Sequence, residues 1–414
     1  MQSRRELTTF LAWSMALAAL GIDLMLPAFG DMRRDFGLPA DSTDVSRLLT
    51  AYFLGLAIGQ LLYGPIADRF GRKTALYGGY LLYGVSALAC ALAPSLALLV
   101  VGRFVWGVGA AGPRVAAQAI IRDTYEGDAM ARAMSFVMAV FLLVPVVAPT
   151  IGDTIAEAGS WRWIFGVCFL AAAAMSVWAI RLPETLDPRH RLQLSPRRVV
   201  AAARSVAAHR QTLAYALAMT ALYGGLTGFI GSAEVIVGET FDHAESFPAL
   251  FAVFGVTMGS AMLVNARVVS RFTARRVVHG MLFVYLVNAV LFVAVAQATG
   301  GRPPLWAFVV QLCMVGVCQS LLIPNCTSIA MLPMAAIAGT AASVIGACQI
   351  AGGAVLGAFT DARYDGTVRP LAIGFLVYGS VAFLLVLWGE GWRLFGAAPA
   401  AKGMEDAELL TVEV

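Results

Sequence analysis

Long apolar runs separated by short polar segments make up most of the chain. A helix that crosses a bilayer needs about 20 mainly apolar residues, because lipid offers no hydrogen-bond partner to an irregular backbone. The pattern predicts an all-α integral membrane protein with twelve transmembrane helices, at residues 8–30, 46–65, 74–93, 96–120, 130–151, 162–181, 211–237, 248–266, 277–298, 305–331, 337–360 and 370–391.

The longest polar segment, residues 182–210, divides these runs six and six. The polar segments after the second and the eighth run each contain Arg-Phe, at 69–70 and 271–272, followed by a basic pair. Such an internal repeat is typical of transporters, in which the binding site lies between two related halves. We therefore predict two pseudo-symmetric six-helix bundles joined by a cytoplasmic basic linker, with these parts: bundle 1–181, linker 182–210, bundle 211–392 and cytoplasmic tail 393–414.

Composition excludes several classes of protein. Hydrophobic residues make up 59% of the chain and charged residues 13%, where a soluble domain carries about 25% charged residues. No dense basic tract indicates a nucleic-acid partner, and no Gly-x-x-x-x-Gly-Lys-Ser/Thr sequence indicates ATP binding. The six cysteines and four histidines lack the spacing of metal ligands. A lipid-modifying enzyme would need clustered carboxylates, His or Ser at a membrane face, so we predict a non-enzyme without metal or cofactor.

The distribution of cations indicates orientation. Most of the 29 Lys and Arg residues fall in segments that share one side of the membrane with both chain ends. Cytoplasmic loops carry an excess of Lys and Arg, so both termini are predicted to be cytoplasmic.

Two ionisable residues within spans are candidates for proton coupling, because charges inside a membrane are costly. Asp23 lies past the middle of run 8–30, and Arg103 lies at a similar depth in run 96–120, which crosses in the other direction. Burial favours a protonated carboxyl and a nearby cation opposes this effect, which together favour proton exchange near physiological pH. We predict that Asp23 carries a proton and that Arg103 modulates it. The alternative is a static ion pair between two helices.

Arg114 follows Arg103 by 11 residues, about three helical turns, so both arginines lie on one helix face. Gly107 lies on the same face, and its missing side chain predicts open space between the two cations. We expect this face to line a cavity in which Arg114 binds an anionic or polar substrate group. The alternative is that Arg114 extends toward the cytoplasmic interface.

Four further residues are predicted to contact substrate: Tyr52, Glu234, Gln311 and Gln319. Tyr52 offers a surface for stacking, although aromatic residues that face lipid are equally common. Glu234 lies near the end of its run, where a position among the lipid headgroups is the simpler interpretation. For Gln311 and Gln319, hydrogen bonds between helices are the alternative.

Several motifs resemble those of the major facilitator superfamily. Gly64-Pro-Ile-Ala-Asp68-Arg69-Phe-Gly71-Arg72-Lys73 looks like the signature loop of that family. Arg103-Phe-Val-Trp-Gly107 and Pro145-Val-Val-Ala-Pro149-Thr-Ile-Gly152 are similar to the fourth-helix and fifth-helix motifs of its drug–proton antiporter branch, with twelve helices. Ile22-Asp23-Leu-Met-Leu-Pro27 and Met134-Ser-Phe-Val-Met138 resemble the bicyclomycin-resistance subfamily. The sequence departs from the branch at Arg114, Ala148 and Asp153.

The resemblance implies that the signature loop latches the two halves together on the cytoplasmic side. Asp68 would favour the N-terminus of a neighbouring helix such as 337–360, and Arg72 would pair with a carboxylate such as Asp123. The glycines of the loop permit a tight turn and close approach. The alternative is that the loop only sets orientation through its charge. The predicted latch residues are Gly64, Asp68, Gly71, Arg72 and Asp123.

Pro145 and Pro149 lie four residues apart, so they stand on one face of the fifth helix. Each removes a backbone donor, which predicts a bent or widened helix. The resemblance implies that this motif, which includes Gly152, limits leakage; the alternative is a kink that neighbouring helices tolerate.

Together with these patterns, the resemblance implies a proton-coupled antiporter that exports hydrophobic or amphipathic antimicrobial compounds by alternating access, and so contributes to multidrug efflux and antibiotic resistance. The expected location is the bacterial inner membrane, where the protein is multi-pass and monomeric. Its expected partners are a small-molecule drug or metabolite and membrane lipid, and the proton gradient supplies the energy. The alternative is a major-facilitator transporter of an anionic or polar metabolite, whose carboxylate or sulfonate the two arginines would hold.

Overall fold

The computed structural model describes residues 4–187, 189, 191 and 196–395, and these residues are almost entirely helical. The helices of the first half are α1 (Arg4–Asp23), α2 (Phe29–Asp35), α3 (Arg47–Phe70), α4 (Arg72–Ala91), α5 (Leu96–Thr124), α6 (Gly127–Glu157) and α7 (Arg162–Trp178). Those that follow are α8 (Pro196–Ala208), α9 (Arg210–Val235), α10 (Phe247–Phe272), α11 (Ala274–Ala298), α12 (Leu305–Met331), α13 (Ala338–Asp361) and α14 (Arg369–Gly389).

The predicted number of membrane crossings is confirmed. The described residues contain 11 continuous helical runs that are long and apolar enough to span a bilayer. The run Leu305–Asp361 has 57 residues, too many for one crossing, and it contains α12, the turn Leu332–Ile337 and α13. Counting α12 and α13 separately gives twelve spans.

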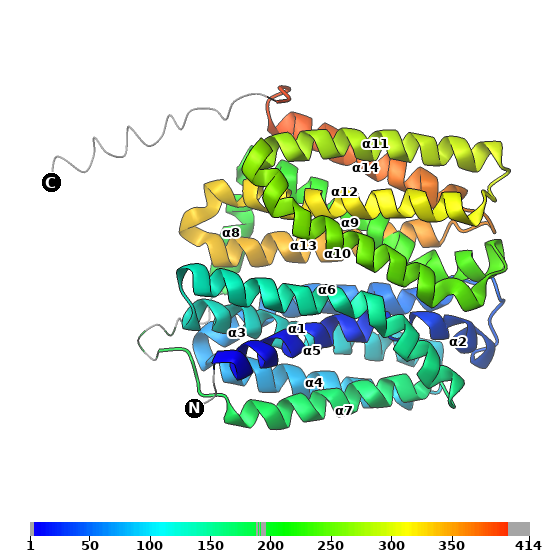
Figure 1. The fold of residues 1–414 in the computed structure, drawn as a ribbon. Coiled ribbons are helices and arrows are strands. Elements are labelled where there is room, and N and C mark those ends of the chain that lie inside the picture. The colour runs from blue at the N-terminus through cyan, green and yellow to red at the C-terminus, as the bar shows by residue number, and fades with distance from the viewer. Residues whose placement is uncertain (1–3, 188, 190, 192–195, 396–414) are drawn as a thin grey trace.

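The spans form two bundles, which lie one above the other in Figure 1, with the N-terminal half below and the C-terminal half above. The halves contact each other where α3 packs on α13, where α6 packs on α10 and where α2 meets α9. A boundary made of a few helix pairs is the architecture expected when two halves rock around a central site.

The predicted linker contains a helix, α8, that the sequence pattern did not reveal. Its Ala202 and Val206 lie four residues apart and are buried, so they form one apolar face, and α8 packs on α13. Positions 188, 190 and 192–195 of the linker, and 396–414 of the predicted tail, lie outside the described residues.

The repeat noticed in the sequence is also a repeat of backbone geometry. Gly71 separates α3 from α4 with φ 104°, and Thr273 separates α10 from α11 with φ 64°. Both residues directly follow Arg-Phe, so the two junctions are made by equivalent positions. The left-handed backbone that glycine adopts freely at the first junction is imposed on a threonine at the second.

Both described ends of the chain lie at one end of the molecule, where α1 begins and α14 ends (Figure 1). The α3–α4 junction and α8 lie at the same end. We call it the basic end, because most of the described cations lie there, and we call the other the far end. The cations at the far end are Arg33, Arg34, Arg47, Arg162, Arg302, Arg363 and Arg369.

Candidate functional site

Asp23 ends α1 inside the protein. Its side chain is buried, with 4% of the residue exposed. Within the described part of the chain, no hydrogen bond or ion pair involves its carboxyl group. A carboxyl group buried in this way is far more stable with its proton than without it, since nothing compensates a negative charge.

Arg103 does not form the static ion pair that was the alternative for it. Its Nη1 donates to the carbonyl oxygen of Gly21 at 2.7 Å, and its Nε donates to that of Leu48 at 3.4 Å. The guanidinium also lies 4.4 Å from the ring centroid of Tyr52 and 4.7 Å from that of Trp106. Arg103 therefore joins α1, α3 and α5 through backbone carbonyls and aromatic rings.

Tyr52 and Gly107 belong to the packing of helices against one another. The Tyr52 hydroxyl donates to the carbonyl oxygen of Ala18 at 2.8 Å, and the residue is fully buried. A Cβ on Gly107 would collide with the Tyr52 carbonyl oxygen, because α5 and α3 touch there. The prediction of open space at Gly107 is therefore wrong, since the small residue serves close helix contact rather than a cavity.

Arg114 lies at the boundary between the halves. It is partly exposed, and its charge acts on the hydroxyl groups of Tyr52 and Tyr223, as does the charge of an ionised Asp23. Tyr223 belongs to α9 of the other half, and its ring packs edge-on against Phe53 at 6.0 Å. Sequence analysis missed Tyr223, because only the tertiary structure brings α9 to this position.

Glu234 binds an arginine of the other half. Both of its carboxylate oxygens accept from Nη2 of Arg33, at 2.8 and 2.7 Å. The two side chains are 13% and 6% exposed, so the pair is largely shielded from water. Glu234 therefore forms a contact between the two halves at the far end.

Gln319 holds helices of the second bundle together. Its Nε2 donates to the carbonyl oxygen of Leu222 at 3.0 Å, so it joins α12 to α9. The side-chain oxygen of Gln311 is buried without a hydrogen-bond partner among the described residues, while its backbone oxygen accepts from Asn288 at 3.2 Å. For Gln319, the structure therefore contains the hydrogen bond between helices that was the alternative to substrate binding.

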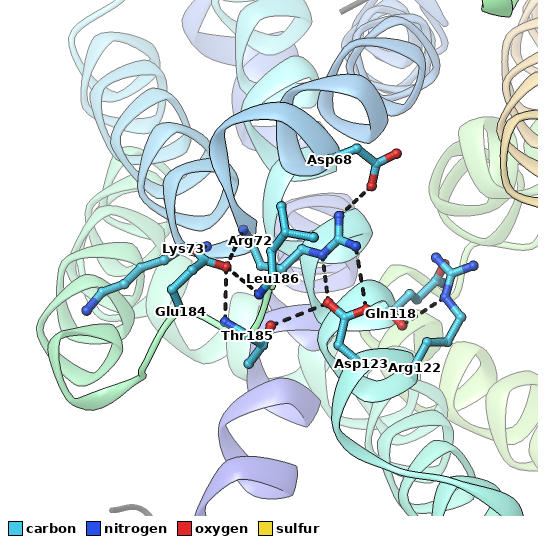
Figure 2. Close-up of polar contacts among 9 residues, drawn as sticks. All are labelled: Asp68, Arg72, Lys73, Gln118, Arg122, Asp123, Glu184, Thr185 and Leu186. Atoms are coloured by element: carbon cyan, nitrogen blue, oxygen red, sulfur yellow. Dashed lines mark hydrogen bonds and ion pairs between the residues drawn. The ribbon is translucent and has the colours of Figure 1, made fainter. Parts of the chain in front are cut away.

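The signature loop forms a polar network at the basic end (Figure 2). Nε of Arg72 binds Asp123 Oδ2 at 2.8 Å, which is the pairing that the sequence predicted, and its Nη1 binds Asp68 Oδ1 at 2.5 Å. Glu184 was not predicted: it accepts from the backbone N–H groups of Arg72 and Lys73, at 2.9 and 3.1 Å. These are the first N–H groups of α4, where a carboxylate is stabilised.

A cavity of about 120 Å³ lies between this network and the second half. Gly64, Asp68 and Arg72 line one side of it, and Gly339 and Thr340, from the first turn of α13, line another. Asp68 thus shares a cavity with the helix N-terminus that the sequence analysis suggested, although its direct partner is Arg72.

The segment 145–152 lies between α1 and the second half. Helix α6 continues unbroken through Pro145 and Pro149. A Cβ on Gly152 would collide with the carbonyl oxygen of Leu24, the residue after Asp23. A Cβ on Gly255 of α10 would lie 3.6 Å from the carbonyl carbon of Pro145. The motif therefore touches both the backbone beside the buried carboxyl group and the opposite half.

A second buried carboxyl group was missed by sequence analysis. Asp361 is the last residue of α13 and is 4% exposed. The predicted span 337–360 ended one residue before it, so hydropathy assigned it to a loop. A signal was available in the sequence, since Asp361 directly adjoins this apolar run and an ionisable residue within a span is a functional candidate.

This architecture defines a class of protein: a multi-pass membrane transporter built of two six-helix bundles around a boundary that contains buried carboxyl groups. Residues 11–358 match the family model of the Major Facilitator Superfamily, and the chain belongs to that family. The predicted family membership is thereby confirmed, and the chain is a transporter rather than an enzyme.

The relatives agree with the more specific resemblance. The chain is 28% identical to a bicyclomycin resistance protein homolog of Haemophilus influenzae, over 86% of this chain and 88% of that protein. It is 27% identical to the multidrug resistance protein MdtL of Klebsiella pneumoniae, over 92% of this chain and 95% of that protein. A crystal structure of a D-xylose–proton symporter has the same fold, with a TM-score of 0.73 and 16% identity, over 97% of this chain and 99% of that one.

Proposed function

We propose that this transporter is a proton-coupled antiporter, which exports hydrophobic or amphipathic antimicrobial compounds across the bacterial inner membrane by alternating access. The relatives named for drug resistance support export of such compounds. The excess of cations at the basic end supports a cytoplasmic location for that end and for both termini.

The observation that carries the proposal is the environment of Asp23. Its carboxyl group is buried and has no cation or hydrogen-bond partner among the described residues. Such a group binds a proton in its buried state and releases it when water or a cation reaches it. Its position next to Leu24, against which Gly152 packs, ties this change to the antiporter motif.

Arg114 supplies a cation that can compete with the proton. It lies at the same boundary, and its charge and that of Asp23 both act on Tyr52 and Tyr223. Movement of one half against the other would change the surroundings of all four of these side chains together. Proton binding and substrate binding would then favour different arrangements of the halves, which is the requirement for exchange.

The test is the substitution Asp23→Asn in purified protein reconstituted into vesicles. We expect it to abolish drug transport driven by a pH gradient, because the amide cannot release a proton, while insertion and folding stay intact. The matched control is Asp41→Asn, at an exposed aspartate in the loop before α3. Transport at the parental rate by the Asp23→Asn protein would rule out the role of this carboxyl group.

A second candidate function is transport of an anionic or polar metabolite. It is favoured by Arg114, for which no carboxylate partner is found in the part of the chain that the structure describes. The two functions predict different effects of Arg114→Ala. If this variant loses transport of anions and keeps transport of neutral drugs, the substrate is an anionic metabolite. If it loses transport of neutral drugs and keeps transport of anions, the substrate is a drug. Competition between charge-neutral drugs and small organic anions in the parent protein provides the same distinction.

A further inference from the structure

A groove of about 480 Å³ lies at the basic end, between the first turns of α1 and the first turns of α6. Both helices begin at this end and pack against each other (Figure 1). The lining combines cations, hydroxyl groups and apolar side chains, and consists of Arg4, Arg5, Thr8, Thr9, Tyr125, Ala129, Arg132, Ala133 and Phe136.

The hydroxyl groups of the groove are bound within the protein. The Tyr125 hydroxyl donates to the carbonyl oxygen of Arg4 at 2.9 Å and lies 2.8 Å from Thr8 Oγ1. Thr8 Oγ1 donates to the carbonyl oxygen of Arg4 at 2.8 Å, and Thr9 Oγ1 donates to that of Arg5 at 3.0 Å. Their protons are therefore committed, so a polar ligand in this groove has to be held by the guanidinium groups.

The three arginines of the groove are free to bind an anion. Arg4, Arg5 and Arg132 are exposed, and none of them forms an ion pair within the part of the chain that the structure describes. The guanidinium of Arg4 lies 5.8 Å from the ring centroid of Tyr125, so its charge is held beside the groove. Cations that line one concave surface attract an anion to it.

The carboxylates near this end do not neutralise the groove. Glu6 is bound on the side of α7, where its Oε1 accepts from Trp178 Nε1 at 3.3 Å and pairs with Arg181 at 3.7 Å. Glu126 and Asp128, at the start of α6, are exposed and do not line the groove. The lining therefore carries three positive charges and no negative one.

The groove continues into an apolar face of α6. Phe136 lines it and is exposed, as are Leu143 and Val147 further along the helix. These positions are 7 and 11 residues after Phe136, close to two and three full turns, so the three side chains share one face. An exposed apolar face of this kind suits hydrocarbon chains. Arg132 lies one turn before Phe136, which puts the cations at the end of that face, where lipid headgroups lie.

From this arrangement we infer that the groove binds one anionic phospholipid from the leaflet at the basic end. The arginines bind its phosphate and headgroup, and an acyl chain lies along Phe136, Leu143 and Val147. A small inorganic anion would use the cations alone, and a zwitterionic lipid brings an ammonium group that the arginines repel. An anionic lipid is the ligand that matches both the charge and the apolar face.

The bound lipid contacts α1 and α6 together, and so joins the helix that carries Asp23 to the helix that carries Pro145 and Pro149. The inference goes beyond the proposed function and does not depend on it. Lipid binding requires neither a drug nor a proton gradient, so it can be measured on the purified protein alone. Failure of drug transport would contradict the proposed function and leave this site untouched.

The first experiment is native mass spectrometry of the full-length protein in detergent, titrated with phosphatidylglycerol. We expect the first phosphatidylglycerol to bind more tightly than phosphatidylethanolamine with the same chains, and to stay bound when glycerol phosphate is added in excess. Equal affinity for the two lipids, or displacement by glycerol phosphate, would overturn the inference, because the latter would indicate a site for small anions.

Variants locate the binding in the groove. Arg132→Gln should weaken phosphatidylglycerol binding about fivefold, and the triple variant Arg4→Gln, Arg5→Gln, Arg132→Gln about a hundredfold. The control is Arg276→Gln, at an exposed arginine of the basic end that lies outside the groove. The substituted side chains are exposed, so the variants should fold, which thermal melting checks. The same affinity in the triple variant as in the parent would contradict the site.

The second experiment uses phosphatidylglycerol with a photoreactive group on one acyl chain. After irradiation in lipid nanodiscs, we expect adducts on peptides from residues 129–147, since the chain lies along that part of α6. The adducts should be lost in the triple variant and kept in Arg276→Gln. No adducts in this segment, or equal amounts in the triple variant, would show that the lipid does not occupy the groove.

Discussion

The guanidinium group of Arg103 is held by backbone carbonyls and aromatic rings rather than by a carboxylate. Hydrogen bonds to Gly21 and Leu48 and contacts with Tyr52 and Trp106 together surround a charge that is fully buried. A planar group with several donors can serve two carbonyls and two rings at once, which a lysine cannot. At the scale of single residues, Arg103 therefore stabilises the joint between α1, α3 and α5.

We predict that Arg103→Lys lowers the free energy of unfolding by about 2 kcal/mol, because a charged hydrogen bond is lost and the stacking is weakened. Thermal unfolding of the purified protein, followed by tryptophan fluorescence, measures the effect. Arg47→Lys is the control, since Arg47 is exposed and its partner Asp44 is close along the chain. Equal melting temperatures for the parent and Arg103→Lys would show that these contacts do not stabilise the joint.

At the scale of elements, the junction of α3 and α4 depends on a glycine. Gly71 has φ 104°, and a Cβ there would collide with the carboxylate of Glu184. Glu184 in turn accepts hydrogen bonds from the first N–H groups of α4, so the same side chain contacts the turn at Gly71 and caps the helix that follows it. The same turn positions Arg72 against Asp68 and Asp123 (Figure 2).

Gly71→Ala is expected to disrupt this network and to slow transport. The added methyl group meets Glu184 and also strains the backbone, which costs on the order of 1–3 kcal/mol. Gly127→Ala is a matched control, because Gly127 also has positive φ, 51°, but nothing lies within 4 Å of a Cβ built there. Gly71, with φ 104° and ψ 157°, lies in a region that is almost closed to other residues, so a larger loss of thermal stability and transport in Gly71→Ala reports this strain and the contact with Glu184 together. Equal losses in the two variants would contradict both.

At the scale of the whole molecule, the halves touch at two levels. The pair of Arg33 and Glu234 joins them at the far end. Nearer the basic end, α3 and α13 lie so close that a Cβ on Gly346 would come within 2.5 Å of Gln60 Nε2. Alternating access would require the contacts at one level to open while those at the other remain.

We predict that Glu234→Gln shifts the protein toward a state opened at the far end, since an uncompensated Arg33 in a shielded position costs about 3–5 kcal/mol. Distances between spin labels at positions 41 and 245, which are exposed on opposite halves near the far end, report the shift in a cysteine-free background. The exchanged pair, Arg33→Glu with Glu234→Arg, should restore the shorter distance in part. If the single and the double variants give the same distribution, the ion pair does not hold the halves together.

The local sequence pattern was enough to predict the twelve spans, the division into halves and the family. Each of these depends on residues that are adjacent in sequence, as does the solubility of a helix in lipid. The sequence also offered Asp123 as a possible partner of Arg72, and the structure contains this pair. Helix α8 was not predicted, because an amphipathic helix in a basic linker contains no long apolar run by which it could be recognised.

What the sequence by itself determined is therefore the number and order of the helices, which hydropathy specifies. Only the tertiary structure decided which polar groups meet. Arg33 and Glu234 lie 201 positions apart, Arg103 took carbonyl partners instead of Asp23, and Gly107 became a helix contact instead of a cavity wall. These outcomes depend on the rotation and depth of each helix, and packing against distant neighbours sets both.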